Sequence, residues 1–105
     1  MQDNLNLCLA GKILTARLSG ELDHHTVGPL RERIDEELFS TRPEVLVMDF
    51  SLVSFMDSSG IGLIIGRAET ARATRSTVKI CGMNDRLVRL VRMSGISRLD
   101  NVTIC

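Results

Sequence analysis

The sequence Asp57-Ser58-Ser59-Gly60 joins two segments with different hydrophobic patterns, and it decides the fold expected for this chain. Residues 45–50, which precede it, are apolar except for Asp49, and Pro43 stands just before them. A short apolar run of this kind is typical of a strand that is buried on both faces. After the junction, apolar residues recur at the three- and four-residue spacing of one helix face: Ile61, Ile64, Ile65, Ala68 and Ala71. The junction is therefore predicted to be a loop that opens a helix.

Ser58 has two interpretations at this position. A helix start presents unpaired backbone N–H groups and a positive dipole end, so a side-chain oxygen is favoured there as a cap. Either Asp57 or Ser58 fits that role. The alternative is a phosphorylation site, because a phosphate on the Ser58 hydroxyl would be accepted by the same N–H groups. Position and composition alone favour the cap.

The composition indicates one globular domain and argues against several kinds of partner. The 105 residues, of which 44% are hydrophobic, are expected to form a single domain over residues 1–105. The 13 basic and 13 acidic side chains give a formal net charge of zero, and Tyr and Trp are absent. Neither nucleic acid nor a membrane surface is therefore expected as a partner. Because the sequence shows no secretory signal and no membrane-spanning run, a cytoplasmic protein is expected.

The cysteines and histidines form no recognisable metal or redox motif. Cys8, Cys81 and Cys105 share no metal-ligand or C-x-x-C spacing. Cys81 lies in an apolar stretch and is predicted to be a small core residue, whereas the role of Cys105 stays open. His24 and His25 are consecutive, so we interpret them as ordinary loop residues. No metal and no cofactor is expected.

The other periodicities complete an α/β domain, with a mixed sheet of about five strands, an N-terminal hairpin and three or four helices. Thr26 and Asn84 are predicted helix caps, and Gly95 is a predicted helix end. Helix-linked strands are expected to run parallel. The predicted elements are strands at 5–9 and 13–18 ending at Gly20, a helix at 27–38, a strand at 45–50, an apolar loop at 52–56, a helix at about 58–74, a strand at 78–81, a helix after Asn84 and a short edge strand at 102–104.

Three features bear on the Ser58 loop. Gly62 and Gly66 lie four residues apart, away from the isoleucine stripe, and each costs a helix about 1 kcal/mol relative to alanine. They indicate the close approach of another backbone, either the molecule's own sheet or a partner chain. Arg67 is expected mainly on the polar side of this helix. Asp23 follows the second predicted strand and would lie beside Ser58 if the two strands were neighbours, although a loop carboxylate is by default simply solvated.

Known catalytic patterns do not fit. Gly60-Ile61-Gly62 lacks the third glycine of a dinucleotide-binding loop, and no phosphate-binding P-loop sequence occurs. Neither Ser58 nor Ser59 stands in a G-x-S-x-G nucleophile elbow, and nothing suggests a catalytic triad. The protein is therefore not expected to be an enzyme.

Residues 55–67, which contain Asp57-Ser58-Ser59-Gly60-Ile61-Gly62, closely resemble the STAS-domain anti-sigma factor antagonists, in particular the SpoIIAA-like proteins of sporulating bacteria. The resemblance includes Gly20-Glu21-Leu22-Asp23, and the element order matches from about Leu5 to Ile104. It implies a binding protein that captures an anti-sigma factor, itself a serine kinase, and thereby releases a sigma factor. The kinase uses ATP to phosphorylate the serine after the motif aspartate, here Ser58, which ends the complex. A PP2C-like phosphatase then resets the protein.

The resemblance also implies which residues bind the partner. The positions carried over are Asp23, Asp57, Ser59, Gly60, Gly62 and Arg67. A monomer is expected. Two other hypotheses stay open: a small domain that binds a nucleotide or anion at the helix start of Ser58, and a STAS protein of another partner-switching pathway, such as general stress control or membrane lipid asymmetry.

Overall fold

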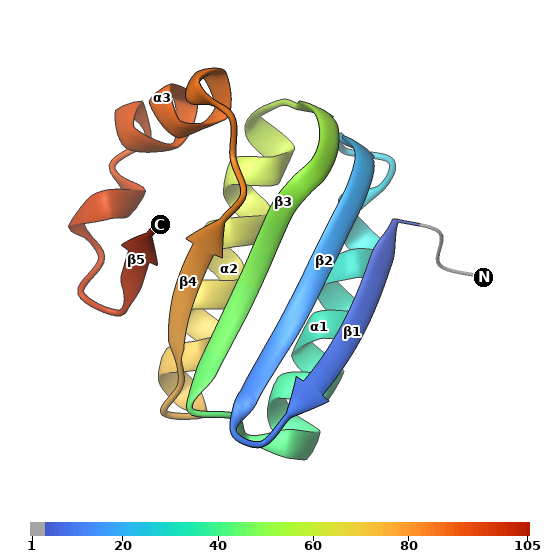
Figure 1. The fold of residues 1–105 in the computed structure, drawn as a ribbon, viewed down its shortest axis with the longest axis vertical. Coiled ribbons are helices and arrows are strands. Elements are labelled where there is room, and N and C mark those ends of the chain that lie inside the picture. The colour runs from blue at the N-terminus through green and yellow to red at the C-terminus, as the bar shows by residue number, and fades with distance from the viewer. Residues whose placement is uncertain (1–3) are drawn as a thin grey trace.

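The computed structural model describes residues 4–105, so the first three residues of the predicted domain lie outside the described part. It contains a five-stranded sheet and three α-helices within those residues, which confirms the expected α/β class and the N-terminal hairpin (Figure 1). In chain order the elements are β1 (Leu5–Ala10), β2 (Ile13–Leu22), α1 (Val27–Thr41), β3 (Val45–Met56), α2 (Ser58–Ala73), β4 (Thr77–Cys81), α3 (Asp85–Met93), the 3-10 helix η1 (Ile96–Arg98) and β5 (Val102–Ile104).

The strands lie in the sheet in the same order as in the chain, β1-β2-β3-β4-β5. The β1–β2 hairpin is antiparallel, and every later pair is parallel, as predicted for strands joined through helices. β5 is an edge strand, which confirms that prediction. Since β2 and β3 are parallel neighbours, with Leu22 opposite Met56, the loops that follow them emerge at the same edge of the sheet.

The core lies between one face of the sheet and the helices α1 and α2. Figure 1 shows both helices behind the sheet in the same view. The apolar stripe predicted for α1 is buried at Leu30, Ile34 and Leu38. In β3, Leu46 and Met48 are buried whereas their neighbours are partly exposed. The prediction that this strand is buried on both faces is therefore wrong, because α1 and α2 cover the same face.

Two strands continue further than the sequence pattern predicts. β3 runs to Met56, so the predicted loop at 52–56 is in fact strand, and β2 runs past Gly20 to Leu22. The two extensions pair with each other, with Gly20 opposite Val53. Each therefore supplies the backbone hydrogen-bonding partner that the other needs. The longer strands carry the Asp23 and Ser58 loops to the end of the sheet.

The helix termini agree with the predictions except at Thr26. Asn84 accepts a hydrogen bond from Leu87 N at 2.9 Å, and Gly95 adopts the left-handed conformation after α3. The Thr26 side chain makes no capping bond to α1. Its hydroxyl instead accepts from Asp23 N at 3.0 Å, so Thr26 holds the turn that precedes the helix rather than the helix itself.

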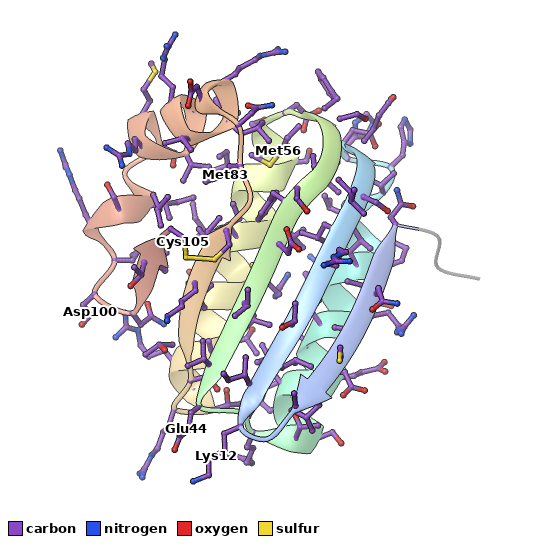
Figure 2. The ribbon with its side chains drawn as sticks, in the orientation of Figure 1. Lys12, Glu44, Met56, Met83, Asp100 and Cys105 are labelled. Atoms are coloured by element: carbon purple, nitrogen blue, oxygen red, sulfur yellow. A yellow bond between two sulfur atoms is a disulfide. The ribbon has the colours of Figure 1, made fainter. Side chains whose placement is uncertain are left out.

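Cys81 is not the small core residue that the sequence predicts. It is half-buried at the end of β4 and forms a disulfide with Cys105 (Figure 2). Cys8 is exposed and unpaired. The disulfide ties the last residue of the chain to β4 beside the short β5 strand, which answers the question that the sequence left open for Cys105.

Cys105→Ser is expected to lower the free energy of unfolding under oxidising conditions by about 3 kcal/mol, because the lost disulfide spans a chain separation of 24 residues. Urea unfolding with and without dithiothreitol measures the effect. The reductant should destabilise the wild type and Cys8→Ser, which keep the disulfide, and leave Cys105→Ser unchanged. Equal unfolding midpoints for the wild type in the two conditions would contradict the prediction.

Gly82→Ala is expected to destabilise the fold by about 3 kcal/mol, through backbone strain and a steric clash together. Gly82 has a φ of +79°, and an added Cβ would lie 2.6 Å from Asp49 Oδ1 and 2.8 Å from Ser51 N. Gly11→Ala is the matched control, because Gly11 has a φ of +61° but open space around it. Strain alone should cost that variant about 1 kcal/mol. If thermal unfolding showed equal losses of stability for Gly82→Ala and Gly11→Ala, the steric clash would contribute nothing.

Candidate functional site

The cap of α2 is Asp57, and this decides between the two cap candidates. The Asp57 backbone is extended, and its Oδ1 accepts a hydrogen bond from Ser59 N at 2.8 Å. Asp57 O also accepts from Gly60 N at 3.0 Å. A capping carboxylate at this end of a helix is favoured by both the hydrogen bond and the helix dipole. Asp57 therefore caps the helix, and the Ser58 side chain does not contribute to the cap.

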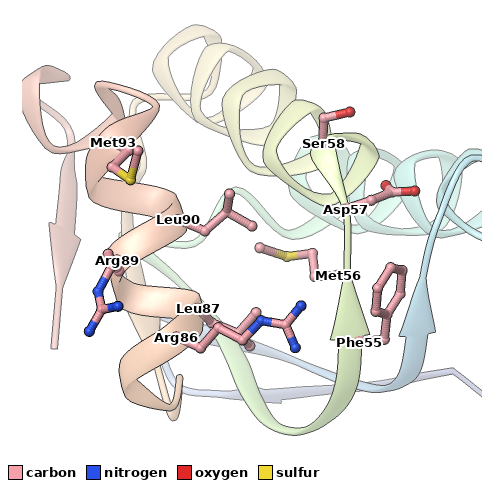
Figure 3. Close-up of a pocket in the computed structure, with 9 residues that line it drawn as sticks. All are labelled: Phe55, Met56, Asp57, Ser58, Arg86, Leu87, Arg89, Leu90 and Met93. Atoms are coloured by element: carbon pink, nitrogen blue, oxygen red, sulfur yellow. The ribbon is translucent and has the colours of Figure 1, made fainter.

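Ser58 is the first residue of α2, and its side chain is exposed. Within residues 4–105, its hydroxyl makes no hydrogen bond. Figure 3 shows the hydroxyl directed away from α3. Since Asp57 supplies the cap, the interpretation of Ser58 as a plain helix cap is wrong. The side chain is free to react, next to a helix start that stabilises an anion.

The Asp23 loop lies beside the Ser58 loop, as expected for neighbouring strands. Asp57 N donates a hydrogen bond to Leu22 O at 3.2 Å, which joins the two loops directly. The Asp23 carboxylate accepts from His25 N at 2.9 Å and from Thr26 N at 3.2 Å. These bonds, above all the one from His25, lower the pKa of Asp23. Asp23 therefore places a negative charge beside the Ser58 loop at neutral pH.

On its other side, Ser58 borders an open apolar groove of about 410 Å³ between α3 and the β3–α2 junction (Figure 3). Phe55, Leu90 and Met93 contribute large apolar side chains that are 42%, 36% and 81% exposed. Arg86 and Arg89 of α3 line the same groove. These α3 residues could not be predicted from the sequence as part of the site, because the fold alone brings them to the Ser58 loop.

A second pocket, of about 290 Å³, lies between α1 and α2. Ser59, Gly62 and Arg67 line it from α2, and Arg31 lines it from α1. Arg67 is 3% exposed, so its predicted place on the polar side of the helix is wrong. Its Nε lies 2.7 Å from Asp35 Oδ1 of α1. Burial lowers the pKa of Arg67, and the Asp35 carboxylate opposes that shift.

The glycines of α2 have different surroundings. A Cβ at Gly60 would overlap the Met56 side chain, so the protein's own packing requires that glycine. A Cβ at Gly62 or Gly66 would meet nothing within 4 Å. The protein's own sheet therefore does not approach either residue, which rules out one of the two explanations offered by the sequence. Close approach of a partner chain stays a prediction.

Among residues 4–105, no three His, Cys, Asp or Glu side chains gather where they could hold a metal ion. None of the described helices combines the length and the apolar character that a membrane crossing needs.

Comparison with known proteins identifies relatives of the whole sheet-and-helix arrangement. A family model described as the STAS domain matches residues 5–104. An anti-sigma F factor antagonist from Paenibacillus polymyxa is 38% identical over 87 residues, which cover 83% of this chain and 74% of the relative. An anti-sigma-B factor antagonist from Listeria monocytogenes is 31% identical over 86 residues, which cover 81% of this chain and 74% of the relative.

Solved structures agree with the sequence relatives. The anti-sigma factor antagonist SpoIIAA in its unphosphorylated form has a TM-score of 0.81 and 27% identity, over 96% of this chain and 87% of that chain. The phosphorylated form of the Bacillus cell fate determinant SpoIIAA has a TM-score of 0.74 and 27% identity, over 96% of this chain and 90% of that chain. The protein with the exposed Ser58 at the start of α2 belongs to the STAS domain family.

Proposed function

We propose that this protein is an anti-sigma factor antagonist. Its unphosphorylated form binds an anti-sigma factor that is also a serine kinase, and a sigma factor is thereby released. Phosphorylation of Ser58 with ATP as donor ends the complex. The observation that carries the proposal is the exposed Ser58 hydroxyl, which is left free by the Asp57 cap in a protein whose relatives are named anti-sigma factor antagonists.

The surroundings of Ser58 suit such a switch. The residue lies at the border of the groove that exposes Phe55 and Leu90, and the ionised Asp23 loop is its neighbour. A phosphate adds about −1.5 to −2 charges at neutral pH. At the start of α2 the dipole and the exposed position accommodate that charge, so the fold is retained. Against a docked partner, the same charge must be desolvated and repels acidic groups.

The remaining carried-over residues fit a partner surface around Ser58. Asp23, Asp57 and Ser59 adjoin it at the end of the sheet, whereas Gly62 and Arg67 belong to the adjacent pocket between α1 and α2. Gly60 packs against Met56 in the free protein, and its contact with the partner is part of the proposal. We further propose a cytoplasmic monomer that a PP2C-like phosphatase dephosphorylates at the exposed Ser58.

The relatives include antagonists of anti-sigma F and of anti-sigma-B factors, so a second candidate is a role in a different sigma pathway from sporulation. The fold and the Ser58 loop serve either pathway equally. The choice of partner in a binding experiment separates the two.

The proposal is tested by mixing the purified protein with a candidate anti-sigma factor kinase of each class in ADP, and measuring complexes by calorimetry. One kinase should bind the wild type and Ser58→Ala with similar affinity, because the Ser58 hydroxyl is exposed and makes no hydrogen bond within residues 4–105. Adding the protein to that kinase bound to its sigma factor should release the sigma factor. Absence of binding to either class would overturn the proposal.

A further inference from the structure

We propose that the pocket between α1 and α2 receives a carboxylate side chain of the anti-sigma factor, with the guanidinium groups of Arg67 and Arg31 as its cationic partners. This inference rests on the proposed function and identifies one chemical feature of the partner. It also assigns a second contact region, separate from the apolar groove on the other side of Ser58.

Arg67 supplies the first argument. Its side chain is 4% exposed and lines the pocket, and its Nε faces the Asp35 carboxylate at 2.7 Å. Its Nη1 is buried and has no hydrogen-bond partner among the described residues. A buried charged donor without a partner is costly, and nearly all such groups in native proteins are satisfied. Because this nitrogen is solvent-inaccessible in the free protein, an acceptor oxygen that enters the pocket from a partner would satisfy it after a shift of the Arg67 side chain.

The charge of the pocket is the second argument. Two guanidinium groups line it, and the pKa of Arg67 is lowered mainly by burial, with a smaller contribution from the Arg31 charge. Asp35 faces one nitrogen of Arg67, and Glu69 also acts on Arg67 but does not line the pocket. Arg31 has no ion pair within residues 4–105. The pocket thus keeps a positive charge without a counter-ion, which a carboxylate complements.

Gly62 supplies the third argument, which is steric. It is exposed on the pocket wall, and a Cβ there would meet nothing within 4 Å in the free protein. Since glycine is less favourable than alanine within a helix, nothing in the free fold accounts for it. A partner backbone that passes close to Gly62 does account for it, and such an approach brings a side chain to the pocket. Ser59 lines the same wall, so this contact is continuous with the Ser58 surface.

The test measures association and dissociation rates with the anti-sigma factor kinase that binds the wild type in ADP. Arg31→Gln and Gly62→Ala are expected to weaken the complex by about tenfold or more, mainly through faster dissociation, because a seated charge pair governs the off-rate. Arg33→Gln, which removes a positive charge from the same helix as Arg31, is the matched control. Arg33 does not line the pocket, so this variant should bind like the wild type.

The outcomes separate this inference from the proposed function. One result is that the kinase dissociates at equal rates from three proteins: the wild type, Arg31→Gln and Gly62→Ala. That result would contradict the proposed carboxylate contact and would leave the proposed function unaffected. Weaker binding of Arg31→Gln that results only from slower association would also contradict the proposed carboxylate contact. Slower association alone indicates long-range electrostatic steering. If neither class of kinase bound the wild type, the proposed function and this inference would both be wrong.

Discussion

Asp35→Ala is expected to lower the free energy of unfolding by about 3 kcal/mol or more, because it leaves the Arg67 guanidinium buried without its carboxylate. Arg67 is 3% exposed, whereas the Asp35 side chain is 27% exposed. Partial solvation of Asp35 puts the expected cost at the lower end of the range for buried ion pairs. Urea unfolding followed by circular dichroism measures this loss.

Two control variants show whether burial of the charge is the cause. Glu44→Ala breaks the Lys12–Glu44 pair, whose side chains are 75% and 69% exposed, and should leave stability almost unchanged. In Asp35→Ala the Arg67 charge is buried without a partner. The double variant Asp35→Ala/Arg67→Met removes that charge, so it should recover much of the lost free energy of unfolding. Equal losses for Asp35→Ala and Glu44→Ala would contradict the account of this ion pair.

Phosphorylation of Ser58 is expected to weaken the complex with the anti-sigma factor by about 100-fold or more, because the added charge must be desolvated beside the apolar groove and near Asp23. Calorimetry with phosphorylated and unphosphorylated protein in ADP measures the change. Ser58→Ala that has been incubated with kinase and ATP serves as the control, and it should bind like the unmodified wild type.

The same modification is expected to leave the fold intact. Amide NMR spectra of the two forms should differ near the Asp23 and Ser58 loops, and agree over β4 and β5. Shifts that reach Val78–Cys81 would instead indicate a rearranged domain, and loss of binding through unfolding rather than through a local block.

The periodic segments of this chain could be predicted from its sequence. The stripe of α1 and the Asn84 cap follow local rules, and both are present where the pattern places them. The ends of β2 and β3 could not be predicted in the same way. Residues 52–56 do not alternate as a half-buried strand should, and they are strand because β2 pairs with them. The pairing partner, rather than the local pattern, determines where these strands end.

In the candidate site, too, some features follow from the local sequence and others depend on contacts between distant segments. The position of Ser58 at a helix start and the proximity of Asp23 follow from the motif and from parallel strand order. The burial of Arg67 does not, because it depends on Asp35 from another helix, 32 residues earlier in the chain. The Cys81–Cys105 disulfide likewise depends on β4 and β5 being neighbours. Contacts between distant segments require the assembled fold.

The most direct test of the central claim is to incubate the protein with its anti-sigma factor kinase and ATP, and to locate any phosphate by tandem mass spectrometry. We predict a single phosphate on Ser58 that is absent from Ser58→Ala, together with loss of the complex that the two proteins form in ADP. A phosphate on Ser59, or no phosphate and a complex unaffected by ATP, would contradict the account.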